Sequence, residues 1–302
     1  MSQSSDVAIK VATAAYAVGW QNSWSDYAQH IRRLVLEASQ QGADILVFPE
    51  YFSMELASLF REEIYQSLER QLDAMQGCLE DFQGLFTRLS QETNTYILAG
   101  TFPVKINQDG TDVYVNRAYW CSPDPDEPLQ WQDKLMMTRF EREEWLISPG
   151  DELKVLSSHF GNVGVNVCYD SEFPKLARRQ VEQGADLILV PSCTDTLAGY
   201  HRVNIGCRAR ALENQCVVVQ SPTVGRANWS PAIDENMGAA CVLGPVDYGF
   251  PPDGIIARNS IVHHATRTEW VMADINLAEV RSIRQSGQVT NYSDWDLQQR
   301  WS

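Results

Sequence analysis

The chain has 302 residues, of which 44% are hydrophobic and 21% are charged, so it is long enough to bury one large core. Its formal net charge of -15, from 39 acidic and 24 basic residues, opposes binding to nucleic-acid phosphates or to anionic lipids. We therefore expect a small-molecule or protein partner, and neither a nucleic acid nor a membrane.

The sequence also favours a cytoplasmic protein. No apolar run approaches the roughly 20 residues that a membrane span needs. The polar opening MSQSSD lacks the basic start and the apolar middle of a signal peptide. The seven cysteines, an odd number, lie mostly inside apolar runs rather than at the spacing of a disulfide framework, which predicts reduced thiols.

Strand and helix patterns alternate from the start of the chain. VAIKVATAAY over 7–16 predicts a strand, the stretch 25–42 predicts a helix with Ser25 as its N-cap, and DILVF over 44–48 predicts a second strand. ELASLFREEIYQSLERQLDAMQG over 55–77 and CLEDFQGLFTRLSQET over 78–93 both carry helical spacing.

The middle of the chain predicts a strand over 95–102 and a hairpin built from 113–121 and 128–136. GADLILVPS at 184–192 then echoes GADILVFPE at 42–50, so the two halves share a weak internal similarity. Strands that alternate with helices, with antiparallel pairs interspersed, predict a layered α/β architecture with helices outside the sheets.

No domain linker is visible, so we expect a single domain over residues 1–302. Residues 225–254 are rich in Gly, Pro and Asp and favour a long surface loop. Residues 276–302 form a mostly polar C-terminal extension with two tryptophans, and we expect it to pack at a subunit interface.

Missing motifs argue against several kinds of site. CxxC, HExxH, GxSxG, GxGxxG and P-loop patterns are all absent from the sequence, which disfavours zinc sites, serine hydrolases, dinucleotide enzymes and NTPases. His263 and His264 are adjacent on an expected strand, so their side chains should face opposite sides and should not pair. We expect no metal site.

Cys168, in VGVNVCYDSEFP, is the first candidate for chemistry. Val163, Val165 and Val167 alternate as in a buried strand, which places the thiol where the strand leaves its sheet. A cysteine at a strand end is more often an inert buried thiol than a nucleophile. Here, however, a polar run and the expected start of a helix follow at once, and backbone N–H groups at such a turn favour a thiolate and a developing oxyanion.

A nucleophilic thiol also needs a base, and no histidine of this chain lies in an obvious strand-end motif. Glu50 follows an apolar strand and a proline, although a glutamate there is ordinarily an exposed loop residue. Lys134 ends an expected strand in WQDKLMMTRFEREEW and Glu141 follows it, although such a run is ordinarily a solvated charged loop.

Taken together, these stretches resemble the nitrilase superfamily, the carbon-nitrogen hydrolases. Glu50 in FPEYF, Lys134 in DKLMMT and Cys168 in VCYDSEFP match the family's Glu, Lys and Cys motifs in order and separation. GADLILVPS and RARALENQCVVV are similar to the stretches that follow the family's cysteine, so the resemblance spans about residues 7–275.

The resemblance implies a four-layer αββα sandwich that pairs with a second subunit through helices near the active site, as a homodimer or a larger homo-oligomer. It also implies that neither a metal nor an organic cofactor takes part. Glu141 stands where the family commonly has a supporting glutamate, and Glu143 and Glu144 are the alternatives for that role.

The resemblance further implies a mechanism. Glu50 would take the thiol proton of Cys168, the thiolate would attack an amide carbonyl, and Glu50 would then protonate the departing amine. The Lys134 ammonium and the backbone N–H of Tyr169 would bind the oxyanion. Water would finally hydrolyse the acyl-enzyme thioester.

The residues after the cysteine bear on the substrate. True nitrilases tend to have Trp-Glu there, whereas Tyr-Asp in this chain resembles the amidase-like branches, so we expect a small amide as substrate. Glu172 stands where several amidase-like relatives have Arg, so it disfavours anionic substrates if it faces the pocket, or simply favours the start of a helix. Arg208 and Arg210 either bind substrate or pair with nearby acids.

Other functions stay open from the sequence. The same thioester chemistry serves nitrile hydrolysis or acyl transfer to an amine, and Cys193 is a second cysteine at an expected strand end. A non-catalytic interaction subunit, with the tail NYSDWDLQQRW at 291–301 as its contact, is the alternative of a different class.

Overall fold

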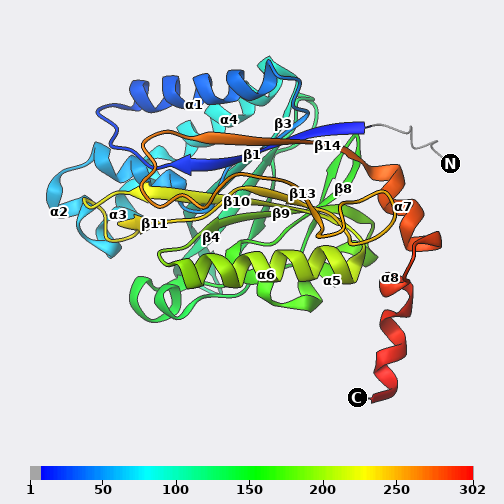
Figure 1. The fold of residues 1–302 in the computed structure, drawn as a ribbon. Coiled ribbons are helices and arrows are strands. Elements are labelled where there is room, and N and C mark those ends of the chain that lie inside the picture. The colour runs from blue at the N-terminus through cyan, green and yellow to red at the C-terminus, as the bar shows by residue number, and fades with distance from the viewer. Residues whose placement is uncertain (1–7, 302) are drawn as a thin grey trace.

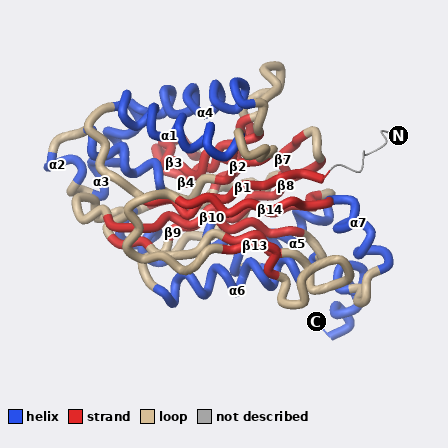
Figure 2. Tube along the Cα trace, turned by 45° about the horizontal axis from the view of Figure 1, so that its top comes forward, coloured by secondary structure: helices blue, strands red, loops and turns tan. Residues whose placement is uncertain are grey.

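The computed structural model describes residues 8–301. Two mixed sheets pack face to face, and helices cover both outer faces (Figures 1 and 2). The elements of the first half are β1 (Ala8–Ala17), α1 (Trp24–Ser39), β2 (Ile45–Val47), η1 (Phe52–Leu59), α2 (Glu62–Tyr65), α3 (Leu68–Met75), η2 (Gln76–Cys78), α4 (Leu79–Thr93), β3 (Tyr96–Gln108), β4 (Thr111–Cys121), β5 (Gln130–Asp133), the π-helical turn η3 (Glu141–Trp145) and β6 (Ile147–Ser148).

The second half of the chain again alternates strands with helices. Its elements are β7 (Val155–Ser158), β8 (Gly161–Val165), η4 (Cys168–Glu172), α5 (Pro174–Glu182), β9 (Ala185–Cys193), α6 (Leu197–Asn214), β10 (Val217–Arg226), β11 (Glu235–Asn236), β12 (Cys241–Leu243), β13 (Ile255–Arg258), β14 (Glu269–Asn276), α7 (Leu277–Ser286), α8 (Asn291–Asp294) and η5 (Trp295–Trp301). The predicted layered α/β architecture is confirmed.

Strand β1 is the place where the two sheets meet. Most of its length pairs antiparallel with β14, but its last residues, Tyr16 and Ala17, pair parallel with Thr223 and Val224 of β10. The first sheet runs β14-β1-β2-β3-β4-β5, and the second runs β13-β12-β10-β9-β8-β7. The sandwich is therefore closed at one corner by main-chain hydrogen bonds as well as by packing.

The layers follow from the period-two alternation of strand side chains. On β1, Ala12, Ala14 and Tyr16 pack into the core beneath α1 and α4, whereas Ile9 and Val11 face the second sheet. Strand β9 is buried along almost its whole length, because α5 and α6 cover its outer face while the first sheet covers its inner face. Such two-sided burial explains its unbroken apolar run.

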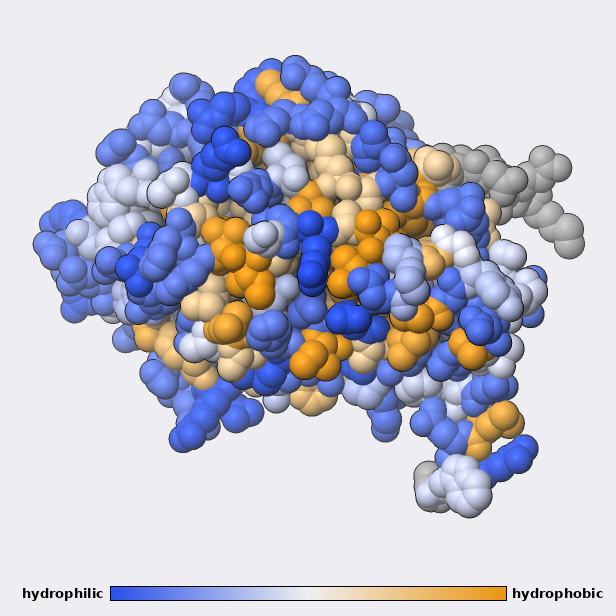
Figure 3. Space-filling view, viewed as in Figure 1, coloured by the Kyte–Doolittle hydropathy of each residue, from blue (hydrophilic) through white to orange (hydrophobic). Residues whose placement is uncertain are grey.

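The surface reflects this arrangement. In Figure 3 the side chains over α1 are mostly hydrophilic, whereas apolar side chains reach the surface in the middle of the same face, over β13 and β14. Across residues 8–301, every helix is too short or too polar to cross a bilayer.

The helical spacing over residues 78–93 is confirmed by α4, whereas that over 55–77 is confirmed only in part. This earlier stretch is divided among η1, α2 and α3, with Phe60 in an extended conformation after η1. Seven of the eight residues of η1 are buried, so this segment packs on nearly all sides. An amphipathic α-helix would bury only one face, which is why periodicity alone misled the prediction.

Three smaller expectations also need correction. The N-cap of α1 is Ser23 rather than Ser25, and its hydroxyl accepts the N–H of Asp26. The long loop expected over 225–254 is interrupted by β11 and β12, because Cys241–Leu243 pairs with both β10 and β13.

The two adjacent histidines are the third correction. His263 and His264 lie in a bend rather than in a strand, and their ring centroids are 4.0 Å apart. Side chains alternate only where the backbone is extended, so the expectation that these rings face opposite sides does not hold.

The C-terminal segment is docked at its start. Arg281 and Arg284 of α7 each place a guanidinium nitrogen 2.6 Å from the Asp186 carboxylate at the beginning of β9. The Arg178 guanidinium lies over the Tyr292 ring, 4.6 Å from its centroid. Beyond this anchor, the last helical turns extend away from the body of the molecule (Figure 1). Packing of this tail at a subunit interface stays a prediction.

Candidate active site

Loops at the ends of strands bring the predicted site residues together. Glu50 follows β2, Lys134 directly follows β5, and Cys168 follows β8. Strand β2 runs parallel to β1 and β3, and β8 runs parallel to β9. The carboxyl ends of parallel strands are where α/β sheets build their binding crevices. These three residues and Glu141 line one pocket of about 380 Å³.

Glu50 is fixed through its backbone from two sides. The Thr223 hydroxyl of β10 donates to the Glu50 carbonyl at 2.6 Å, and Tyr51 adopts the left-handed conformation with φ of 55°. Gly100 makes room for this turn, because a Cβ at that position would lie 2.1 Å from the Pro49 carbonyl oxygen. The glutamate is therefore held in a crowded turn between the two sheets rather than in an exposed loop.

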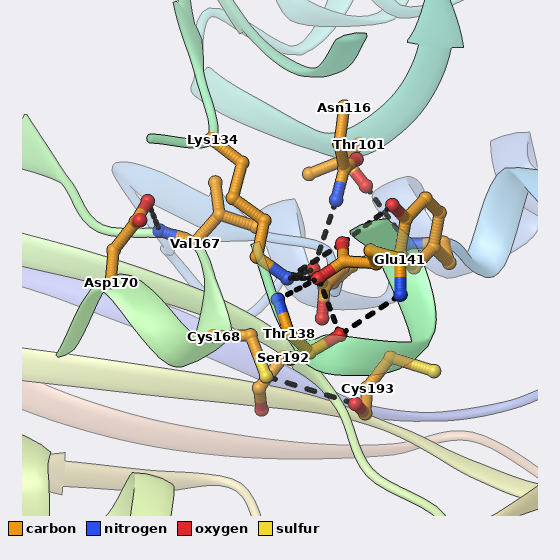
Figure 4. Close-up of polar contacts among 12 residues, drawn as sticks. Thr101, Asn116, Lys134, Thr138, Glu141, Val167, Cys168, Asp170, Ser192 and Cys193 are labelled. Atoms are coloured by element: carbon orange, nitrogen blue, oxygen red, sulfur yellow. Dashed lines mark hydrogen bonds and ion pairs between the residues drawn. The ribbon is translucent and has the colours of Figure 1, made fainter. Parts of the chain in front are cut away.

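The Lys134 ammonium joins two buried carboxylates. Its nitrogen lies 2.8 Å from Glu50 Oε1. It also lies 2.8 and 2.7 Å from the two oxygens of Glu141, as Figure 4 shows. All three side chains are almost fully buried, at 1%, 1% and 4% exposure. Buried charges are tolerated only when they are paired and hydrogen-bonded, so this geometry specifies one arrangement of the three groups.

The Glu141 carboxylate also accepts hydrogen bonds from Tyr51 and Thr138. Its Oε1 accepts the Tyr51 hydroxyl at 2.7 Å, and its Oε2 accepts both the N–H and the hydroxyl of Thr138 at 2.9 and 2.8 Å. Burial acts to raise the pKa of Glu141, but the charge and hydrogen bonds of Lys134, with those of Thr138 and Tyr51, outweigh it and hold the pKa below its usual value. Glu141 therefore stays ionised opposite Lys134.

The other two glutamates of FEREEW are not part of the pocket. Glu143 pairs with Arg139 at 2.7 Å, and both Glu143 and Glu144 are exposed. Of the three glutamates, the π-helical turn η3 buries only Glu141.

Asn116 is a site residue that the sequence did not reveal. It lies in β4 and is fully buried, and its side-chain amide donates to Glu50 Oε1 at 2.9 Å. Its main-chain carbonyl accepts the Lys134 N–H at 2.9 Å. Asn116 thus contacts both Glu50 and Lys134. A polar residue within the strand sequence VYVNRAYWC was the only indication of this role in the sequence.

Cys168 sits at a strained turn. Its φ is 47°, a left-handed conformation that is uncommon for residues other than glycine, and the side chain is 4% exposed. Its sulfur lies 3.7 Å from the Cys193 carbonyl oxygen. Burial and the Glu50 charge raise the pKa of the Cys168 thiol well above its usual value, and Lys134 opposes them only in part. The thiol is therefore protonated at neutral pH and would need a base to act as a nucleophile.

Glu50 has the properties of such a base. Burial raises its pKa to about 7, against the opposing charge of Lys134, and hydrogen bonds from Lys134 and the Cys168 thiol lower it. A carboxyl that titrates near neutrality accepts and returns a proton readily at physiological pH.

Further predicted residues line the same pocket. Tyr169 and Glu172 both belong to the turn η4, and the Glu172 carboxylate lies 3.5 Å from the Arg202 guanidinium of α6. The second candidate thiol, Cys193, also lines the pocket, but its sulfur is directed at Asn236 Oδ1, 3.1 Å away. Figure 4 shows the two sulfur atoms pointing in different directions.

Arg208 and Arg210 do not line the pocket. Arg208 is exposed and donates to the Asp253 carbonyl at 3.0 Å. Arg210 is buried, where it donates to the Ser171 carbonyl at 3.1 Å and pairs with Glu213 at 2.7 Å. The expected pairing with a nearby acid is therefore seen for Arg210, whereas Arg208 contacts a main-chain carbonyl. No cluster of three or more His, Cys, Asp or Glu side chains suited to a metal occurs within the described part of the chain.

Replacing Lys134 by methionine should destabilise the fold in a pH-dependent way. Methionine has a similar length but no charge, so Glu50 and Glu141 would be buried without a cation, and losing one partner of a buried ion pair costs about 3–5 kcal/mol. Both carboxyls would then bind protons in the folded state, with pKa values above those of the unfolded chain.

Because the unfolded carboxyls lose their protons above roughly pH 4.3, the variant should lose stability relative to the native protein as pH rises from about 5 to about 8. Urea unfolding at both pH values measures this difference. An equal loss at the two pH values would contradict the inferred burial of two carboxylates around one cation.

Comparisons with known proteins identify the family and the fold. The carbon-nitrogen hydrolase family profile matches residues 10–285. The probable hydrolase YhcX of Bacillus subtilis is 33% identical over 286 residues, which cover 95% of this chain but 53% of that protein, so this chain spans about half of its length. Omega-amidase NIT2-B of Xenopus laevis is 27% identical over 268 residues, covering 86% of this chain and 87% of that one.

The fold has a solved counterpart in Nit3 of Saccharomyces cerevisiae, a member of branch 10 of the nitrilase superfamily. The TM-score is 0.69 at 22% identity, and the match covers 94% of this chain and 96% of that one. The predicted nitrilase-like αββα sandwich is confirmed. The chain belongs to the carbon-nitrogen hydrolase family.

Proposed function

We propose that the protein hydrolyses the carbon-nitrogen bond of a small amide, with Cys168 as the nucleophile, and releases ammonia or an amine. The observation that carries this proposal is the Lys134 ammonium held between Glu50 and Glu141 in the pocket that also contains the Cys168 thiol. The omega-amidase and deaminated glutathione amidase activities named for relatives favour an amide over a nitrile.

In the first step, Glu50 takes the thiol proton as the sulfur attacks the amide carbonyl carbon. With a pKa of about 7, a large share of Glu50 is ionised at neutral pH, whereas the raised pKa of Cys168 keeps its proton on sulfur until substrate arrives. Transfer of the proton during attack avoids a free thiolate in a buried site.

Negative charge then develops on the carbonyl oxygen. The Lys134 ammonium and the backbone N–H of Tyr169 are the proposed donors to this oxyanion, and losing one such donor commonly costs about a hundredfold to a thousandfold in rate. When the tetrahedral intermediate collapses, the carbon-nitrogen bond breaks and Glu50 returns its proton to the leaving nitrogen. Water, with Glu50 again as base, hydrolyses the thioester.

Glu141 supports this chemistry indirectly. It holds the ammonium through two hydrogen bonds while Glu50 accepts only one, so the position of Lys134 changes little when Glu50 gains or loses a proton. Its depressed pKa keeps the countercharge constant through the cycle.

The reaction can be tested by variants and by mass. Cys168→Ala and Glu50→Gln should abolish ammonia release from a panel of small amides, because one removes the nucleophile and the other the proton acceptor. Intact-mass measurement of the native protein after mixing with the same panel should detect an acyl adduct on Cys168. Cys216→Ala, which alters a buried cysteine that does not line the pocket, is the matched control.

Turnover retained in the Cys168 variant would contradict the assignment and direct attention to Cys193. An adduct that resolves only when hydroxylamine is added would indicate acyl transfer rather than hydrolysis. Absence of an adduct across the panel, with intact fold, would favour a non-catalytic subunit.

Charge selection at the pocket is proposed to depend on Glu172 and Arg202, which face each other at 3.5 Å. Glu172 is the less exposed of the two, at 22% against 60%, so its charge is the less screened by water. We therefore expect neutral and amine-bearing amides to be better substrates than amides with a carboxylate.

Glu172→Gln should raise kcat/KM for carboxylate-bearing amides relative to neutral ones, because Arg202 loses its partner and becomes available to the substrate. Arg202→Gln should shift the preference in the opposite direction, toward amine-bearing amides. Each substitution changes one charge at nearly constant size, so each is the control of the other. Shifts in the same direction, or a native preference for dicarboxylate monoamides, would contradict the role of Glu172.

We further propose that α6 forms the contact of a homodimer. Leu197, Ile205 and Leu212 are 50%, 66% and 42% exposed, and their spacing places them along one side of the helix. The same helix contributes Gly199 and Arg202 to the pocket lining, so a second copy docked here would lie beside the pocket.

Ile205→Arg should convert a dimer into monomers in sedimentation-velocity experiments, because a charge would have to be buried at the centre of the contact. Ile261→Arg, at an exposed isoleucine outside α6, should leave the dimer unchanged. A native protein that sediments as a monomer at high concentration would contradict the proposed contact.

A further inference from the structure

Asp170 is a buried carboxylate that connects the Cys168 turn to the Lys134 loop. Its Oδ1 accepts the N–H of Leu135 at 3.1 Å and that of Met136 at 2.7 Å, and its Oδ2 accepts the N–H of Val167 at 2.9 Å. Leu135 and Met136 directly follow Lys134, and Val167 directly precedes Cys168. One side chain therefore holds the main chain beside both residues, as Figure 4 shows for Val167.

The chemistry of these contacts requires a carboxylate. All three partners are N–H donors, and only an ionised carboxylate offers acceptors on both oxygens without a proton of its own. Burial raises the pKa of Asp170 to about 7, opposed by the Lys134 charge and by the three N–H groups. Burying a carboxylate with no cation in hydrogen-bond contact costs free energy unless its hydrogen bonds compensate. The three N–H groups provide this compensation for Asp170.

The turn that Asp170 holds is the strained one. A left-handed conformation costs roughly 1–2 kcal/mol for a residue other than glycine, and Cys168 adopts it with φ of 47°. The Asp170 N–H donates to the Val167 carbonyl at 3.0 Å, and the Ser171 hydroxyl donates to the Cys168 carbonyl at 2.7 Å. These local bonds fix the shape of the turn, but neither of them reaches the Lys134 loop.

The opposite side of the turn is fixed by α6. A Cβ on Gly206 would lie 2.8 Å from the Ser171 carbonyl oxygen, and Arg210 donates to that same oxygen at 3.1 Å. The turn would therefore stay docked on α6 if Asp170 lost its hydrogen bonds. The turn would, however, no longer be held in a fixed position relative to the loop that carries Lys134.

We propose that Asp170 is a positioning residue, which sets the separation between the Cys168 sulfur and the Lys134 ammonium by binding the main chain beside each of them. The proposal rests on the proposed function, since the separation matters only if the sulfur attacks a carbonyl whose oxygen Lys134 binds. A displacement of about 1 Å in such a site can cost about a hundredfold in rate.

Asp170→Asn tests this role. The amide keeps one acceptor oxygen but presents an NH₂ group where the second oxygen stood, so it cannot satisfy both the Val167 N–H and the Leu135 and Met136 N–H groups. We expect kcat to fall by about a hundredfold on the best amide of the panel, with KM nearly unchanged. The rate at which iodoacetamide alkylates Cys168, followed by intact mass, should fall as well.

Asp186→Asn is the matched control. Asp186 is also a buried aspartate, at 4% exposure, but it accepts hydrogen bonds from Arg281 and Arg284 at the start of β9, the end opposite Cys193 and the pocket. This variant should lower the melting temperature while kcat and the alkylation rate stay at native values. A loss of stability alone therefore cannot reproduce the result expected for Asp170→Asn.

The outcomes separate the two levels of inference. If the native protein is alkylated on Cys168 and Asp170→Asn reacts and turns over like Asp186→Asn, the positioning role is overturned and the proposed function stands. If Cys168 of the native protein is inert to iodoacetamide and to the amide panel, the proposed function itself fails. Should Asp170→Asn not fold, Asp170→Ser, which leaves room for water, is measured in the same way and judged by the same criteria.

Discussion

The site depends on burying one ammonium between two carboxylates. Lys134, Glu50 and Glu141 together carry one excess negative charge when all are ionised, and no net charge when Glu50 holds a proton. Charge is costly in this setting, so the balance of the cluster places the titration of Glu50 near neutrality while Lys134 and Glu141 keep fixed charges. Glu50, which lies beside the Cys168 thiol, is thus the member of this cluster that gains or loses a proton near neutral pH.

The sandwich supplies the rigidity that this cluster needs. Glu50 follows β2 of the first sheet and Cys168 follows β8 of the second, so their approach depends on how the two sheets are joined. The join is local to the site: β10 pairs with the end of β1, and Thr223 of β10 binds the Glu50 carbonyl. The main-chain pairing that joins the two sheets therefore lies next to the turn that holds Glu50.

Much of this arrangement could be predicted from sequence, for physical reasons. Glu50 and Cys168 each follow an apolar strand, a local pattern that places a polar side chain at a sheet end. The family resemblance related them to Lys134, which follows the polar strand β5. The internal echo also has a counterpart, because Gly42 and Gly184, both with positive φ, precede the buried strands β2 and β9. Two-sided burial made these strands easy to recognise.

The remaining contacts could not be predicted because no local pattern records them. Asn116 reaches Glu50 across 66 residues and Tyr51 reaches Glu141 across 90, so their partners depend on strand pairing and not on periodicity. The helical spacing over 55–77 predicted α2 and α3 but not η1, because tertiary burial on several sides overrode the helical pattern there. The charge of Glu172 could be read from the sequence, but its contact with Arg202 of α6 could not.

In the proposed reaction, the substrate adds a last constraint on the base. An amide that filled the pocket would displace water from around Cys168 and Glu50, which would further disfavour the charged form of the carboxyl and strengthen it as a proton acceptor. Lys134 opposes that change, because its attraction for the carboxylate grows as water leaves. In the proposed mechanism the ammonium would thus keep Glu50 ionised when desolvation would otherwise protonate it, and the same ammonium would then face the developing oxyanion. Substrate binding and base strength would then be coupled through a single cation, whose position depends on Glu141 and on the main chain beside Lys134.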